Sequence, residues 1–218
     1  MKKPSLLSLI AAFACVALYA QTPDYRFGKV SAEELRMTSY DKDPDAAAVY
    51  LYEENSLFYQ IDREIGLTSD YRARIKILKS DGTDQANVSI PYTDEYSVRE
   101  SVFGIDAVAY NLVDGKIVKT PLKKQYIFTE QVGENHKLVK FSIPEVREGT
   151  VIEYKFRKTS KNPTYIPSFR FQHDIPVARC HMQALIPEFF KFNLNLKGYI
   201  KVNIEDGSTN GSVGSGSD

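Results

Sequence analysis

The sequence has no excess charge of either sign, because 28 Lys and Arg residues balance 28 Asp and Glu residues in a chain of 218. A nucleic-acid-binding domain normally carries a clear positive excess, so we expect no nucleic-acid partner. Tryptophan is also absent, but 14 Tyr and 12 Phe supply the large rings that a core needs. With 43% hydrophobic residues, the chain is long and apolar enough for one large or two small domains.

Motifs for cofactors and metals are missing as well. None of the three histidines, His136, His173 and His181, has a partner at metal-ligand spacing. His173 and His181 fall on two neighbouring expected strands and could approach each other, but two histidines are too few for a zinc site. No strand is followed by a glycine-rich phosphate loop. We therefore expect no cofactor and no bound metal.

Long apolar runs are limited to the N-terminus. A positively charged start precedes the run Leu6–Val16, and small residues lead on to Ala20. This order is typical of a secretory signal peptide, and the run is shorter than the roughly 20 residues of a membrane span. We predict that residues 1–20 are removed and that the protein is exported to the periplasm or envelope of a bacterium. An uncleaved anchor and lipidation at Cys15 are the alternatives.

Strand patterns dominate the remainder. A capping box between Ser31 and Glu34 predicts a short helix over 31–37, and Asp43-Pro44 favours a helical turn up to Ala48. Apolar and polar residues then alternate with period 2, which is typical of half-buried strands. We expect strands at 49–52, 57–61, 71–77, 86–92, 108–113, 116–120, 138–143, 151–157, 169–173, 177–186 and 189–196.

Short turns separate these expected strands. Residues 53–56 are expected to turn the first pair, Asp114-Gly115 suits a type I′ turn, and 138–143 is expected to pair with 151–157. The sequence therefore predicts an all-β fold, an antiparallel β-sandwich or layered sheets, with a short N-terminal helical segment. We assign residues 21–206 to this β-rich domain and the Gly- and Ser-rich residues 207–218 to a flexible tail or linker.

Few side chains suggest chemistry. Cys180 and His181 are neighbours on an expected strand and so point to opposite faces, and Cys180 shares its face with apolar residues. A buried inert thiol is the preferred interpretation. A stripe of tyrosines, if it is exposed, could bind sugars or a partner protein. This stripe comprises Tyr50, Tyr52, Tyr59 and Tyr71.

Several segments, taken in order, resemble one known family. They are Phe27-Gly28-Lys29-Val30-Ser31, Arg72–Leu78, Asp114-Gly115-Lys116-Ile117-Val118, Lys140-Phe141-Ser142-Ile143-Pro144, Gly149-Thr150-Val151-Ile152-Glu153-Tyr154 and Ile186-Pro187-Glu188. Together they resemble the domain of unknown function 3857, over about residues 24–200. The resemblance implies a β-rich module that precedes a transglutaminase-like domain in exported bacterial proteins. The Cys-His-Asp machinery of that second domain has no counterpart in this sequence.

Three hypotheses follow from the residues and the resemblance. The first is a non-catalytic exported module that supports or recruits a transglutaminase-like domain, or an envelope protein or peptide. The second is a module that binds carbohydrate or another envelope polymer through exposed tyrosines. The third is an autonomous hydrolase, which requires Cys180 to be accessible and within reach of His173 or His181.

Overall fold

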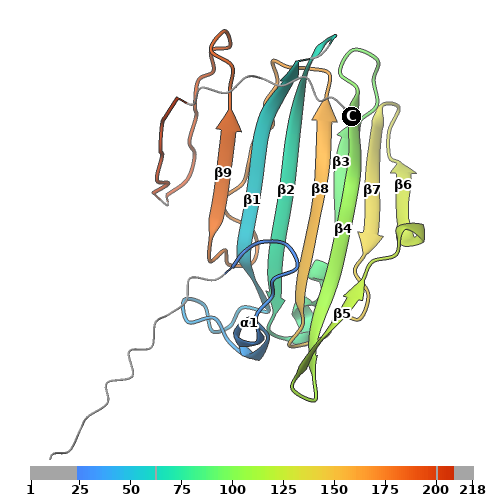
Figure 1. Cartoon of the computed structure of the whole chain (residues 1–218), viewed down its shortest axis with the longest axis vertical. Coiled ribbons are helices and arrows are strands. Elements are labelled where there is room, and N and C mark those ends of the chain that lie inside the picture. Colours follow the sequence, from blue (N-terminus) through green and yellow to red (C-terminus); the bar gives the residue numbers. More distant parts are fainter. Residues whose placement is uncertain (1–23, 62, 200, 209–218) are drawn as a thin grey trace, which may run out of the picture.

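The computed structural model of this chain describes residues 24–61, 63–199 and 201–208. The predicted signal peptide at 1–20 and most of the predicted tail lie outside the described residues. Two β-sheets form the body of the molecule, and one short helix lies at one end (Figure 1). None of the helices in the described segments is long and apolar enough to cross a membrane.

The elements follow one another in a simple order. They are α1 (Ala32–Arg36), β1 (Ala48–Ile61), β2 (Ile65–Ile77), η1 (Ser80–Ala86), β3 (Asn87–Thr93), β4 (Glu100–Val113), β5 (Lys116–Pro121), η2 (Lys124–Tyr126), β6 (Ile127–Gln131), β7 (His136–Ser142), β8 (Val151–Ser160) and β9 (Cys180–Leu185). Six strands form one sheet in the order β5-β4-β8-β2-β1-β9, and three form the other in the order β3-β7-β6. All pairs are antiparallel except β1 with β9. The predicted all-β class is confirmed.

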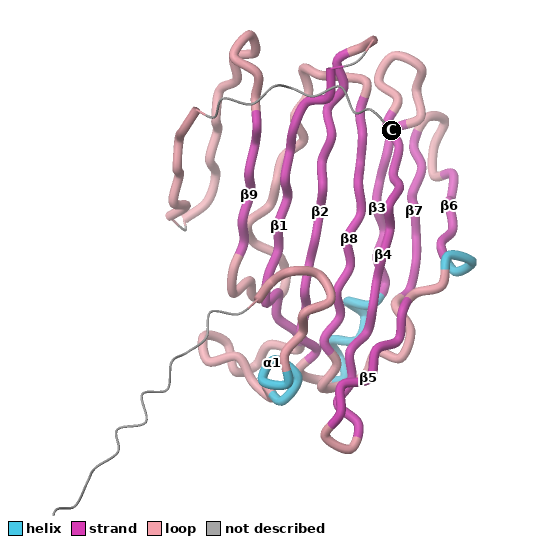
Figure 2. The backbone as a smooth tube through the Cα atoms, in the orientation of Figure 1, coloured by secondary structure: helices cyan, strands magenta, loops and turns pink. Residues whose placement is uncertain are grey.

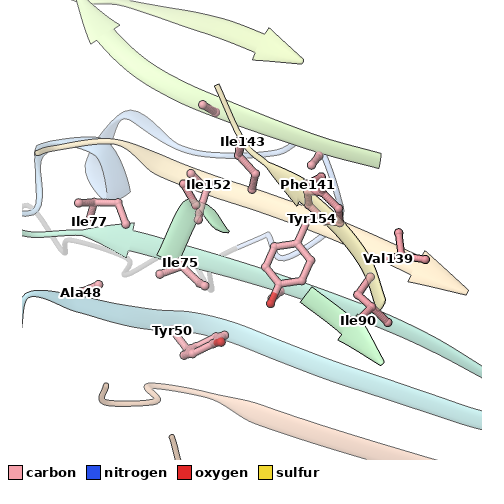
Figure 3. Close-up of a cluster of buried hydrophobic side chains, with 14 residues drawn as sticks. Ala48, Tyr50, Ile75, Ile77, Ile90, Val139, Phe141, Ile143, Ile152 and Tyr154 are labelled. Atoms are coloured by element: carbon pink, nitrogen blue, oxygen red, sulfur yellow. The ribbon is translucent and has the colours of Figure 1, made fainter. Parts of the chain in front are cut away.

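The main core lies between the two sheets. In Figure 3, Ile75, Ile152 and Tyr154 of the larger sheet point toward Val139 and neighbouring residues of the smaller one. We call the face of the six-stranded sheet that carries these side chains the inner face. Its other face, the outer face, is covered at one end by α1 and the chain around it (Figure 2).

The two local signals with the clearest chemistry are confirmed. Ser31 Oγ accepts from the amide of Glu34 at 3.1 Å, and Glu34 Oε2 accepts from the amide of Ser31 at 2.7 Å, so both halves of the capping box are present. Asp114 and Gly115 join β4 to β5 with φ angles of 49° and 74°. Both residues therefore have the positive φ that a type I′ turn requires.

The expected turn at residues 53–56 is wrong, because β1 runs unbroken from Ala48 to Ile61. Polar side chains in the middle of the strand form hydrogen bonds with side chains of β2. For example, Asn55 Oδ1 accepts from Ser69 Oγ at 2.6 Å. After Asp43 the chain forms a tight turn at Pro44-Asp45, closed by a hydrogen bond from the Ala46 amide to the Asp43 carbonyl at 3.2 Å, and no helix reaches Ala48, where β1 begins.

Strand pairing differs from the expectation at two further places. Residues 138–143 and 151–157 do not form a hairpin, because β7 joins the smaller sheet and β8 the larger one. Residues 169–173 and 189–196 lie outside every strand. For the second of these segments, the described chain offers no strand with which it pairs.

Candidate functional site

A bulge in β1 decides which of its side chains face the core. Register shifts between Tyr50 and Tyr52, so the alternation of faces is interrupted once along the strand. Tyr50 belongs to the inner core, whereas Tyr52 stacks on Tyr25 of the N-terminal segment at 4.4 Å between ring centroids. Beyond the bulge, Glu53 faces inward with an exposed fraction of only 1%. The bulge therefore brings a carboxylate into the core side of the sheet.

Three polar groups surround the Glu53 carboxylate. Tyr71 donates its hydroxyl to Oε1 at 2.6 Å, His173 Nε2 lies 2.8 Å from Oε2, and the Cys180 thiol donates to Oε2 at 3.4 Å. The His173 ring also stacks on Tyr50, with centroids 4.6 Å apart. We call Glu53, Tyr71, His173 and Cys180 the Glu53 cluster. It ties β2, β9 and the loop before β9 to one buried carboxylate.

The chemistry of the Glu53 cluster disfavours a cysteine nucleophile. Burial and the neighbouring Glu53 charge raise the pKa of Cys180 to about 12, so the thiol keeps its proton at neutral pH. A catalytic cysteine needs the opposite environment, one that is electropositive and stabilises the thiolate. His173 directs its Nε2 to the same carboxylate oxygen as the thiol. The environment differs from the buried, apolar one that the sequence predicted, because Cys180 is half-buried and its thiol contacts Glu53.

The tyrosine stripe does not meet the condition of exposure on which its binding role depended. Tyr50, Tyr52 and Tyr59 are each less than 10% exposed, and Tyr71 packs against the main core. The bulge also separates the first two onto opposite faces, so the four rings share no surface. Burial raises the pKa of Tyr50 and of Tyr71. The hypothesis of sugar binding through these rings therefore loses its basis.

On the outer face, a buried ion-pair network fastens the N-terminal segment to the sheet. Arg74 Nη2 lies 2.7 Å from Glu153 Oε1, and its Nη1 lies 2.7 Å from Glu34 of α1. The other oxygen of Glu153 accepts from the amide of Gly28 at 2.8 Å and from the Tyr110 hydroxyl at 2.9 Å. Arg74 and Glu153 are each 1% exposed. This network holds the N-terminal segment against the outer face of the sheet.

Lys76 is a second buried cation on the same face. Its ammonium donates to the carbonyl oxygens of Leu35 at 2.7 Å and Gly149 at 2.6 Å, and the side chain is fully buried. Both acceptors are neutral, and burial lowers the pKa of Lys76 to about 8. The backbone carbonyl at the end of α1 thus complements a cation, as helix C-termini generally do.

The most unusual surface of the molecule follows β9. From the last residue of β9, Leu185, onward, large apolar side chains are exposed in the described residues up to Ile204, and those after Leu185 lie outside regular secondary structure. We call this set the apolar strip; its members are Leu185, Ile186, Phe189, Phe192, Leu194, Leu196, Tyr199 and Ile204. Phe190 packs against the sheet through its stacking on Tyr59, at 4.8 Å between ring centroids.

Sequence patterns indicated part of these sites and missed the rest. The alternation of Phe190, Phe192, Leu194 and Leu196 predicted a strand over part of the apolar strip, but not that the side chains of the strip would be exposed. Glu53, by contrast, looked like a turn residue because nothing local reveals the bulge. No group of three or more His, Cys, Asp or Glu residues in the described part of the chain is arranged to hold a metal ion.

Comparison with known proteins agrees with the resemblance. A family model described as a domain of unknown function with a solved structure, DUF3857, matches residues 66–214. The sequence matches no curated protein.

Two solved structures are similar to this chain at low sequence identity. One is the crystal structure of a "putative protease" from Parabacteroides distasonis ATCC 8503, with 15% identity and a TM-score of 0.47 over 62% of this chain and 28% of the other. Another is native yeast LTA4 hydrolase, with 14% identity and a TM-score of 0.26 over 59% of this chain and 18% of the other. The chain therefore spans less than a third of the length of either protein.

Proposed function

The chain belongs to the DUF3857 family, and we propose that it is a non-catalytic exported module that docks a second folded domain through the apolar strip. The observation that supports this proposal is the exposure of the strip. Phe189 is 62% exposed, Leu194 69% and Leu196 48%. Burying each of these side chains contributes about 1.5–3 kcal/mol of free energy. A partner that covers them would therefore gain several kcal/mol of binding free energy.

The partner we propose is a polypeptide that supplies a β-strand or a sheet edge. The segment 189–196 alternates apolar and polar residues, which suits a strand with one buried face. It lies beside β9, the terminal strand of the larger sheet, whose outer edge carries no paired strand in the described chain. Strand addition satisfies the backbone groups of both chains while it covers alternate side chains. A transglutaminase-like domain is the partner that the family resemblance suggests.

We also propose that the module has no catalytic activity of its own. The Glu53 cluster holds Cys180 as a protonated thiol, and its histidine is directed at a carboxylate rather than at the sulfur. On the outer face, Arg74 and Lys76 hold the N-terminal segment through Glu34 and the Leu35 carbonyl. Both arrangements support a role in positioning and binding.

Thermal unfolding with and without a partner domain tests this function. The probe is a transglutaminase-like domain taken from a protein that also carries a DUF3857 domain. We expect the midpoint of the cooperative transition to rise with domain concentration, since binding to the native state alone stabilises it. Leu194→Ser and Phe189→Ser should abolish the rise and leave the midpoint of the free chain unchanged, because both side chains are exposed.

A matched control separates strip-specific binding from general stickiness. Tyr96→Ser alters a side chain that is 86% exposed and lies outside the apolar strip, so this variant should respond to the domain as the parent does. An unchanged midpoint for the parent chain, or an equal loss in Tyr96→Ser, would contradict the proposal.

A further inference from the structure

The outer face of the larger sheet carries a groove, which is separate from the apolar strip. It has a volume of about 530 Å³ and crosses β1, β2, β8 and β4. Four neighbouring strands about 4.8 Å apart span about 14 Å, which matches an extended peptide of about four residues. We call it the outer groove. Phe27 of the N-terminal segment and Phe103 of β4 both line it.

Positive charge exceeds negative charge in the outer groove. Its lining includes Arg72, Lys155 and Arg157 but only two carboxylates, Glu54 and Asp70. Arg157 is paired with Asp70, to which its Nε and Nη2 each donate at 2.6 Å. Arg72 pairs with Glu54. Lys155 is therefore the cation without a carboxylate in the lining of the groove; its nearest carboxylate, Asp106, lies outside that lining at 3.8 Å.

Arg72 and Lys155 each have N–H donors that make no hydrogen bond within the described residues. Arg72 pairs with Glu54 through Nη2, while its buried Nε is the one enclosed side-chain nitrogen or oxygen of the described residues that has no partner. Lys155 lies 3.8 Å from Asp106, beyond hydrogen-bond distance, and its side chain is 45% exposed. The two cations are direct cross-strand partners on β2 and β8. Their Cβ atoms are thus about 5 Å apart, which allows one carboxylate to contact both.

Apolar surface borders these cations. The Lys155 ammonium lies 4.6 Å from the centre of the Phe27 ring, and Phe103 is 48% exposed at a bulge where Gly104 has a φ of 65°. A ligand that places a carboxylate on the cations can therefore rest an apolar side chain on an aromatic ring. The two carboxylates of the groove disfavour a dianion such as phosphate, because like charges repel at this distance.

We propose that the outer groove binds a short extended peptide segment that carries a carboxylate side chain next to an apolar one. The carboxylate lies between Arg72 and Lys155, and the apolar neighbour packs against Phe103. Glu54 and Ser56 are placed to accept hydrogen bonds from the amides of the peptide. This site lies on the opposite face from the Glu53 cluster, and it does not depend on the docking role of the apolar strip.

Titration of the full chain with a defined peptide, followed by NMR of its backbone amides, tests the proposal. The probe is acetyl-Leu-Glu-Phe-Ala-amide, and its control is the same peptide with Gln in place of Glu. We expect shifts at Arg72, Phe103 and Lys155, with the Gln peptide binding about fivefold more weakly, the effect of one partly exposed ion pair. Equal affinity for both peptides, or no binding, would overturn the proposal.

Variants localise the site and guard against misfolding. Lys155→Gln and Phe103→Ser should each weaken the Glu peptide about fivefold, and both side chains are exposed enough to leave the melting temperature unchanged. Lys140→Gln is the matched control, because Lys140 is 47% exposed and pairs with Glu130 on the other sheet. The same loss in Lys140→Gln would overturn the assignment, and so would displacement of the peptide by inorganic phosphate at equal concentration.

Discussion

Replacing Arg74 by Met removes the centre of the buried network that holds the N-terminal segment. The arginine contacts Glu153, Glu34 and the carbonyl oxygens of Asp24 and Arg26. In Arg74→Met the Glu153 charge stays 1% exposed and keeps only the Gly28 amide and the Tyr110 hydroxyl. Leaving one partner of a buried ion pair uncompensated costs about 3–5 kcal/mol.

Equilibrium unfolding in urea measures this loss in the free energy of unfolding, and thermal unfolding shows it as a lower melting temperature. For a domain of this length, a loss of 3–5 kcal/mol lowers the melting temperature by about 6–20 °C. Arg157→Met is the matched control, because its pair with Asp70 lies on the same sheet but is 40% exposed on both sides. We expect that variant to lose no more than about 1 kcal/mol.

A double variant separates the charge from the packing. Arg74→Met with Glu153→Leu removes both charges, and exchanging a buried ion pair for apolar residues is often neutral or stabilising. The double variant should therefore recover most of the stability that Arg74→Met loses. If Arg74→Met unfolds like Arg157→Met, or if the second substitution adds to the loss, the reasoning about this network is refuted.

Three further predictions concern other buried groups. Lys76→Met should change how stability depends on pH. Because the folded pKa, about 8, lies below the ordinary lysine value of 10.5, the unfolded state binds more protons between these values. The parent chain should therefore gain up to about 3 kcal/mol relative to the variant as pH rises through that window, as measured by urea unfolding; a constant difference would contradict it. In a Cys15→Ser background at pH 8, iodoacetamide should modify Cys180 at least about a hundredfold more slowly in the folded chain than in urea, and Glu53→Gln should accelerate the reaction; equal folded and unfolded rates would exclude the raised pKa. Gly82→Ala should cost about 3 kcal/mol, because the added Cβ would lie 2.3 Å from the Ala47 carbonyl oxygen, whereas Gly115→Ala meets open space and should cost only about 1 kcal/mol for its φ of 74°; similar losses in thermal unfolding would contradict this difference.

Local chemistry explains which parts of the fold were predictable. The capping box of α1 and the turn at Asp114-Gly115 each depend on residues within four positions of one another, so the sequence displays the whole determinant. The period-2 patterns likewise identified most strands. They could not assign β7 and β8 to different sheets, because that choice depends on long-range packing.

The candidate sites were less predictable, because they depend on geometry that no short segment contains. The bulge at Tyr50–Tyr52 reverses the faces of β1, which separates Tyr52 from Tyr50 and turns Glu53 toward His173 and Cys180. Glu53 and His173 are 120 residues apart. Only the fold brings them together, so spacing rules could not find the Glu53 cluster.

The apolar strip is the reverse case, where sequence and structure complement each other. The alternation in 189–196 predicts a strand, and the described structure leaves that segment unpaired with its apolar side chains exposed. Either observation alone has an ordinary explanation. Together they support a strand that pairs only when a partner is present.

Amide hydrogen exchange over residues 189–199, measured with and without the transglutaminase-like domain, tests the docking proposal most directly. Backbone amides outside regular structure exchange rapidly, and strand pairing slows them. We predict rapid exchange across this segment in the free chain and strong protection, with alternate side chains covered, when the domain is bound. Binding of the domain without protection of this segment would contradict the proposal, as would a segment already protected in the free, monomeric chain.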